Sequence, residues 1–155
     1  MFSNAALHGM DDPTEVIKGV HRALRPGGRF VGELGGKGNV QAIVAALREA
    51  LRGRGIDPAP FNPWYFPSQE EDGDLLRQCG FSVDELSIFS RPTPLAEDLS
   101  GWLKIFARSF LAALQADEQG AFLAEVREKL MPGLCTREGR WVADYVRLRF
   151  YAIRS

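Results

Sequence analysis

The sequence predicts an α/β fold in which helices cover a β-sheet, and three observations lead to this prediction. An amphipathic helical pattern ends at a Pro-Gly-Gly turn at residues 26–28, and a short apolar run follows directly at 29–34. Two further runs with high β propensity occur at 81–89 and 142–150. Between these runs, apolar residues recur at helical spacing. Alternation of strands with helices is typical of layered α/β domains.

The first helix is expected to begin after Asp12, which can cap it, with Pro13 in the first helical position. Pro26 ends the helix because its ring fixes φ and removes a backbone donor. Residues 2–7 resemble the last part of a strand. The apolar stripe expected to face the sheet consists of Val16, Val20, Ala23 and Leu24.

A second helix is expected after Asn39, which can serve as its cap, and Gly53 ends it. Residues 56–67 contain four prolines and therefore predict a stiff, aromatic-lined loop. The spacing of Ser68 and Glu71 is that of a capping box and predicts a short third helix. The apolar face of the second helix is expected to be Val40, Ile43, Val44, Leu47 and Leu51.

The run at 81–89 predicts a strand with a bulge, since its apolar phase shifts between Val83 and Leu86. Residues 92–140 predict an insertion of two helices before a long final strand from Val142 to Phe150. The apolar positions at helical spacing in the insertion are Leu99, Leu103, Phe106, Phe110 and Leu114, followed by Phe122, Val126 and Leu130.

Composition sets bounds on partners and location. The 155 residues suffice for a single domain, and the formal net charge of −1 provides no basic field for nucleic acid or an anionic membrane. Two cysteines, Cys79 and Cys135, lie far apart in the sequence, which favours a reduced compartment. The sequence has no signal-peptide pattern and no transmembrane run. We therefore expect a cytoplasmic protein that binds neither nucleic acid nor membrane.

Several segments of the sequence resemble the second half of class I S-adenosylmethionine-dependent methyltransferases, most closely the small-molecule type that includes trans-aconitate methyltransferase. The resemblance is carried by FSNAALH at 2–8, DDP at 11–13, LRPGGRFV at 24–31 and PWYFPS at 63–68, and it continues through the strand at 141–154. Gly9 stands where the family usually has an aromatic residue, commonly Trp.

This resemblance implies an incomplete Rossmann-like sheet, with strands equivalent to the family's fourth, fifth, seventh and sixth, in that spatial order. No GxGxG-type loop follows an apolar strand in the sequence, so the cofactor-binding half is expected to be missing from residues 1–155. An incomplete sheet exposes an edge and an apolar face, and exposed edges tend to pair. We therefore expect a homodimer or a higher oligomer.

The resemblance also implies S-adenosylmethionine as cofactor and a small molecule as methyl acceptor. It places Asn4, Ala5, Ala6 and Leu7 beside the cofactor, whereas His8, Trp64 and Tyr65 are candidates for substrate contacts. The loop at 35–39 is either a flexible connection or a source of N–H groups for an anion. No metal-binding pattern and no catalytic triad occur, so the catalytic residues remain unknown.

Two functions follow as expectations. The chain is either the C-terminal part of a small-molecule methyltransferase, inactive on its own, or a non-catalytic remnant or binding module that self-associates.

Overall fold

The computed structural model describes residues 1–155 and divides into two compact units. Unit 1 consists of residues 1–39, 64–91 and 145–155, and unit 2 of residues 40–63 and 92–144. The helices of the expected 92–140 insertion therefore belong to the same unit as the segment 40–63.

Unit 1 contains a four-stranded sheet in the order β1-β2-β6-β3, formed by Phe2–Asn4, Arg29–Gly35, Val146–Arg154 and Phe81–Ser90. β1 and β2 are parallel, whereas β6 runs antiparallel to both of its neighbours, β2 and β3. This order agrees with the 4-5-7-6 order expected from the sequence. The register shift between Val83 and Glu85 confirms the expected bulge.

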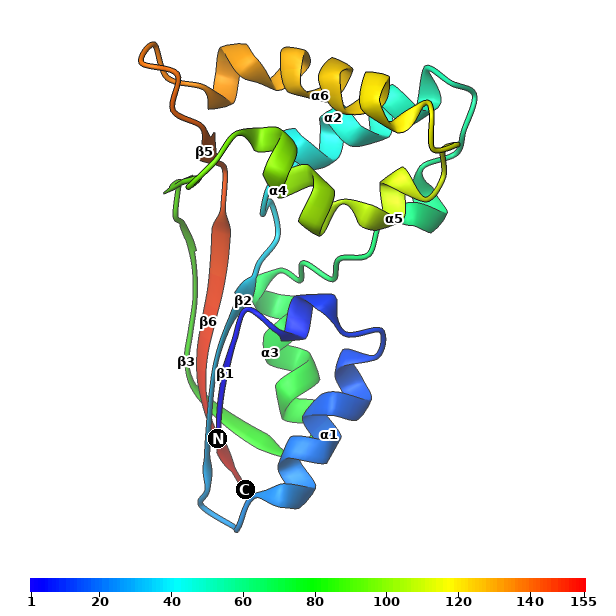
Figure 1. The fold of residues 1–155 in the computed structure, drawn as a ribbon. Coiled ribbons are helices and arrows are strands. Elements are labelled where there is room, and N and C mark those ends of the chain that lie inside the picture. Colours follow the sequence, from blue (N-terminus) through cyan, green and yellow to red (C-terminus); the bar gives the residue numbers. More distant parts are fainter. The chain divides into compact units, whose positions relative to one another are not determined.

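The helices α1 (Pro13–Ala23) and α3 (Gln69–Gln78) cover one face of this sheet (Figure 1). Asp12 caps α1 by accepting a hydrogen bond from the Glu15 N–H, and the capping box of α3 is present as expected. The stripe on α1 requires one correction, because Ala23 is exposed and Ile17 is buried in the core. The core beneath the helices is formed mainly by Leu7, Ile17, Phe30, Leu34, Leu76, Phe81, Leu148 and Phe150.

The N-terminal strand is shorter than expected. It ends at Asn4, and the expectation that residues 2–7 are strand was wrong because Ala5 adopts a φ of 52°, which turns the chain. A single turn of 3-10 helix, η1 (Leu7–Gly9), follows and leads into α1.

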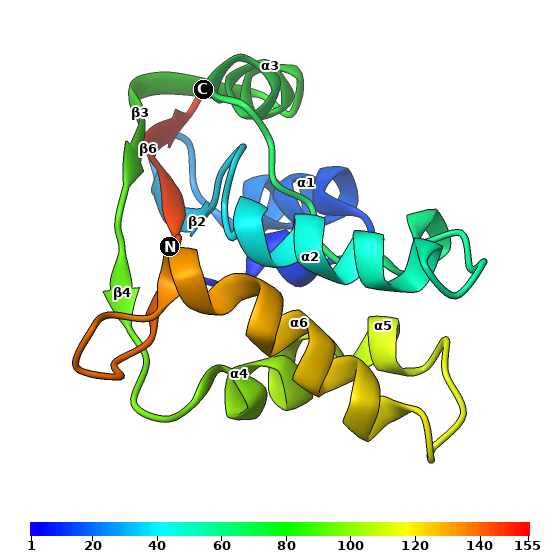
Figure 2. The same ribbon diagram turned by 90° about the horizontal axis from the view of Figure 1, so that it is seen from above.

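In unit 2, the helices α2 (Gln41–Arg52) and α6 (Gln119–Leu134) lie against each other, with α4 (Leu99–Phe106) and α5 (Arg108–Leu111) beside α6 (Figure 2). The insertion thus contributes three helices rather than two. The chain leaves helical geometry at Ala107, which is buried, while the expected core residue Phe106 is 50% exposed. Unit 2 also holds a short 3-10 helix, η2, at Ala59–Phe61.

The long final strand expected from Val142 to Phe150 is divided in two. β5 (Val142–Ala143) pairs with β4 (Thr93–Pro94) in unit 2, whereas β6 begins at Val146 in unit 1. Asp144 lies between β5 and β6 and accepts hydrogen bonds from N–H groups at the N-terminus of α2. Its backbone oxygen accepts from the Val40 N–H, and its Oδ2 accepts from the Ala42 N–H at 2.8 Å.

The expected cap of α2, Asn39, has another role. Its Oδ1 accepts a hydrogen bond from the Val146 N–H at 2.9 Å, while the N-cap position of α2 is taken by Val40. The cap prediction was wrong because Asp144, distant in sequence, satisfies the helix N-terminus that a local side chain would otherwise have to satisfy.

Candidate functional site

The candidate site lies in unit 1, where the parallel strands β1 and β2 end. The carboxyl ends of parallel strands line the ligand crevice in open α/β sheets. The segment after β1 runs from Ala5 to Gly9, and the segment after β2 runs from Gly36 to Asn39. The segment 64–67 is hydrogen-bonded to both: the Tyr65 N–H donates to the His8 carbonyl, and the Lys37 N–H donates to the Pro67 carbonyl.

The residues expected beside the cofactor differ in exposure. Asn4, Ala5 and Ala6 are exposed, whereas Leu7 is only 4% exposed and belongs to the core of unit 1. The Ala5 N–H donates to the Glu33 carbonyl at 2.8 Å, which extends the β1–β2 ladder by one residue before the chain turns. Two small side chains and one carboxamide are therefore presented at the strand end.

His8 connects the segment after β1 with the end of β2 and with the segment 64–67. Its Nδ1 accepts a hydrogen bond from the Gly35 N–H at 3.0 Å, and its carbonyl oxygen accepts from the Tyr65 N–H at 3.0 Å. The imidazole also contacts the Phe66 ring, with 5.8 Å between the ring centroids. The side chain is thus held in place from β2 and from the 64–67 segment.

These contacts set the protonation state of His8. Burial lowers the pKa of the imidazole below its ordinary 6.5, and the nearby positive charge of Arg147 lowers it further. A ring nitrogen that accepts from a backbone N–H carries no proton. At neutral pH His8 is therefore a neutral imidazole with its proton on Nε2, which makes Nε2 a hydrogen-bond donor.

The aromatic segment lies next to His8. The rings of Trp64 and Phe66 stack at 5.8 Å with an interplanar angle of 14°. Burial raises the pKa of Tyr65 to about 12, with smaller contributions from the negative charges of Asp72 and Glu71. The Tyr65 phenol is therefore protonated at neutral pH and can donate a hydrogen bond.

A close approach at Gly35 explains why β2 ends in a glycine. A Cβ on Gly35 would lie 2.5 Å from the Phe66 ring and 2.8 Å from Asn39 Nδ2. No real Cβ atom tolerates such contacts, so only glycine allows the aromatic segment to pack on the end of β2.

The loop at 35–39 is tied to unit 1 by most of its backbone N–H groups. The N–H groups of Gly36, Lys37 and Asn39 donate to the carbonyl oxygens of Val146, Pro67 and Gly36, respectively, and the Gly35 N–H donates to His8. Four of the five N–H groups at 35–39 are therefore used within unit 1, and the Gly38 N–H is the one left for an anion.

Asp72, which lies in the first turns of α3, was not among the residues expected at the site. Its side chain is buried, with 1% exposed, and Oδ2 has no hydrogen-bond partner. Burial raises the pKa of this carboxyl to about 6. Helical spacing contained the signal, because Asp72 stands four residues before the core residue Leu76 and therefore on the same face of α3.

The carboxylate of Glu33 serves a different role. Arg91 Nη1 lies 2.7 Å from Oε1, and Arg149 Nη2 lies 2.6 Å from Oε2. Two cations thus neutralise this nearly buried carboxylate, which is consistent with a structural ion-pair network rather than with proton transfer.

The structure contains no group of three or more His, Cys, Asp or Glu side chains that could hold a metal ion. None of its helices combines the length and the apolar character that a membrane span requires.

Comparison with known proteins identified a relative by sequence and solved structures with a similar fold. The chain is 39% identical over 161 residues to an uncharacterized methyltransferase of Schizosaccharomyces pombe. The match covers 98% of this chain but 61% of the yeast protein, so the chain spans about three fifths of that relative. No protein-family model matches the sequence.

Two solved structures resemble the fold. A candidate methyltransferase of Bacillus halodurans aligns over 99% of this chain and 68% of its own, with a TM-score of 0.57 and 11% identity. The YcgJ protein of Bacillus subtilis aligns over 99% of this chain and 62% of its own, with a TM-score of 0.51 and 14% identity. The chain has a methyltransferase-type α/β fold. At these identities the likeness concerns the fold alone.

The buried carboxyl of Asp72 predicts a specific pH dependence of stability. Its folded-state pKa lies above the ordinary 3.8, at about 6, so the folded state retains the proton longer than the unfolded state as pH rises. This residue therefore lowers the free energy of unfolding progressively between about pH 4 and pH 6, by roughly 2–3 kcal/mol in total.

Urea unfolding of the wild type and of Asp72→Asn should show this effect as a difference that grows in favour of the variant from pH 4 to pH 7. Asp74→Asn is the matched control, because Asp74 lies on the same helix but is exposed and paired with Arg77. A difference between wild type and Asp72→Asn that stays constant with pH would contradict the assignment.

Proposed function

We propose that this chain is part of an S-adenosylmethionine-dependent methyltransferase that acts on a small-molecule acceptor. The observation that carries the proposal is the 39% identity to a protein named a methyltransferase, which extends over 98% of this chain. The methyltransferase-type fold supports it, as does the preformed edge at the ends of β1 and β2.

The residues at this edge fit one part of the cofactor. Asn4, Ala5 and Ala6 are exposed and compact, so a ligand can approach the backbone at the end of β1, and the Asn4 carboxamide can donate and accept hydrogen bonds. When bound, S-adenosylmethionine supplies a methyl group on a positively charged sulfur. The remaining cofactor contacts are proposed to come from polypeptide outside these residues, since the yeast relative is longer than this chain.

The acceptor is proposed to contact His8, Tyr65 and Trp64. A neutral His8 with its proton on Nε2 and a protonated Tyr65 would both donate to oxygen atoms of a small molecule, and the stacked Trp64 and Phe66 rings would provide an apolar wall. These residues bind and orient, which is the main contribution a protein makes when the cofactor carries the reactive group.

The experiment uses S-adenosylhomocysteine, the reaction product, in calorimetric titrations. This chain alone is expected to give no binding at about 1 mM. A chimera in which the chain replaces the matching part of the S. pombe relative should bind the product with a Kd of about 10 μM. In the chimera, Ala6→Trp should weaken binding more than about tenfold, which corresponds to 1.4 kcal/mol. Ala45→Trp, on the exposed side of α2, is the control and should not.

Three results would contradict the proposal. Failure of the yeast relative to bind would remove the methyltransferase assignment. Binding by the relative but not by the chimera would show that this chain does not provide a competent half. Binding by the isolated chain would overturn its proposed inactivity.

The second candidate function is self-association without catalysis, and the edge of the sheet favours it. β1 is an edge strand, and Phe2 is 70% exposed on it. The Ala5 N–H and the Met1 carbonyl bond to β2, so alternation along the strand directs the N–H groups of Phe2 and Asn4 outward. Such an edge can pair with a second copy.

Light scattering at about 50 μM should therefore report a dimer for the wild type, and Phe2→Lys should shift the mass toward the monomer, because a charge on an edge opposes pairing. Lys18→Glu, on the exposed surface of α1, serves as the control. A monomeric wild type would exclude this mode of association.

A further inference from the structure

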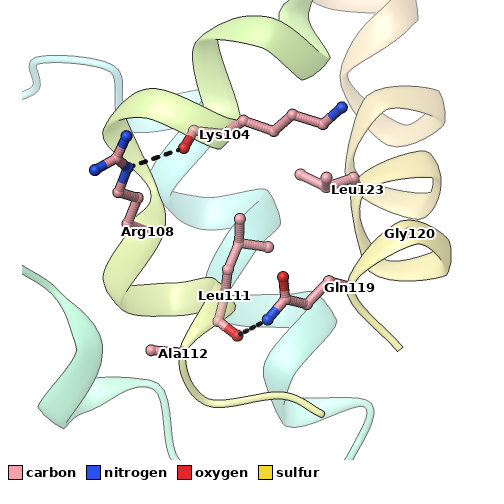
Figure 3. Close-up of a pocket in the computed structure, with 7 residues that line it drawn as sticks. All are labelled: Lys104, Arg108, Leu111, Ala112, Gln119, Gly120 and Leu123. Carbon is pink, nitrogen blue, oxygen red and sulfur yellow. Dashed lines mark hydrogen bonds between the residues drawn. The ribbon is translucent and has the colours of Figure 1, made fainter. Parts of the chain in front are cut away.

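Unit 2 contains a cavity of about 520 Å³ that the proposed methyl transfer does not use. It lies where α4 and α5 face the first turns of α6, as Figure 3 shows. The volume is in the range of small-molecule sites, which are commonly about 300–1,000 Å³.

The base of the cavity is apolar. Leu111 on α5 and Leu123 on α6 line it and are only 8% and 7% exposed. Both side chains point into the space between the helices in Figure 3. A ligand that covers the exposed part of these side chains would remove that apolar surface from water, which contributes to affinity in small-molecule sites.

The sides of the cavity are positively charged. Lys104 and Arg108 line it, and its lining includes no Asp or Glu. Lys104 extends from α4 toward α6, past Leu123 (Figure 3). Neither cation forms a salt bridge in the structure, and the only hydrogen bond of the Arg108 side chain is the one from Nε to the Lys104 carbonyl at 3.4 Å. The Lys104 charge is therefore available to an anion between the helices, whereas the Arg108 guanidinium lies on the side of its helix away from α6 (Figure 3).

The α6 side of the cavity adds a polar group and open space. Gln119 Nε2 donates to the Leu111 carbonyl at 3.1 Å, which fixes the carboxamide and leaves its Oε1 as an acceptor. Gly120 follows, and a Cβ at this position would meet no atom within 4 Å. The side of the cavity formed by α6 therefore has free space for a side chain at Gly120.

We propose that this cavity binds an amphipathic organic carboxylate, a small acid whose carboxylate meets Lys104 and whose hydrocarbon part covers Leu111 and Leu123. A simple inorganic anion would leave the apolar base uncovered, and a neutral hydrocarbon would leave Lys104 without a partner. Charge-assisted hydrogen bonds to a carboxylate combined with apolar burial use both features. The proposal does not depend on the methyltransferase assignment.

The probe is 2-naphthoate, titrated into the ¹⁵N-labelled chain, with the neutral 2-naphthamide as the matched compound without charge. Naphthoate should shift the amide signals of Leu111, Gln119 and Leu123 and bind about tenfold more tightly than naphthamide. Lys104→Glu combined with Arg108→Glu should abolish this preference. Arg137→Glu combined with Arg140→Glu makes the same change in net charge outside the cavity and should preserve it.

A variant that fills the cavity tests the location. Gly120→Leu places a side chain in the open wall and should weaken naphthoate binding at least about tenfold, while the helix tolerates it because Leu is a better helix former than Gly. Gly133→Leu makes the same substitution on α6, also in open space but away from the cavity, and should bind like the wild type.

The proposal is overturned if naphthoate causes no shifts up to about 10 mM, if naphthamide binds equally well, or if Gly120→Leu and Gly133→Leu bind alike. Methyltransferase activity or binding of S-adenosylhomocysteine is not measured in any of these titrations, so their outcome is separate from that of the proposed function.

Discussion

The architecture of the candidate site depends on the absence of a side chain at Gly35. Because no Cβ stands there, Phe66 can pack on the end of β2, beside the Gly35 N–H that donates to Nδ1 of His8. The His8 carbonyl in turn accepts a hydrogen bond from the Tyr65 N–H. These contacts join the segment after β1, the end of β2 and the segment 64–67. A larger residue at position 35 would displace the Phe66 ring from the end of β2.

The polar groups at the same edge almost all have hydrogen-bond partners. The loop after β2 uses its N–H groups on neighbouring backbone, and Asn39 uses its side chain on Val146. Buried polar groups that have partners are inexpensive, whereas Asp72 Oδ2 has none, and burial raises the pKa of this carboxyl to about 6. The side-chain donors that remain for a ligand include the Nε2–H of His8, the hydroxyl of Tyr65 and the carboxamide of Asn4, whereas most backbone N–H groups of the glycine-rich loop are already used.

Local signals in the sequence were sufficient for much of the fold. The Pro-Gly-Gly turn, the Asp12 cap, the capping box at Ser68 and the bulge after Val83 all depend on residues close in sequence. The errors arose where distant residues decide: Asp144 supplies the cap expected from Asn39, and pairing with β4 separates β5 from β6. In the site, His8 and Tyr65 could be named from the family resemblance, but the bond between His8 and Gly35 requires the folded chain.

The central claim is that the carboxyl edge of β1 and β2 holds a neutral His8 oriented by Gly35. Long-range ¹H–¹⁵N correlation spectra of the His8 imidazole at pH 7 test it most directly, because the ¹⁵N shifts distinguish the two tautomers. We predict the Nε2–H tautomer, a titration midpoint below 6.5, and a hydrogen-bond coupling between the Gly35 amide and Nδ1. A protonated Nδ1, or an imidazole that is charged at pH 7, would contradict it.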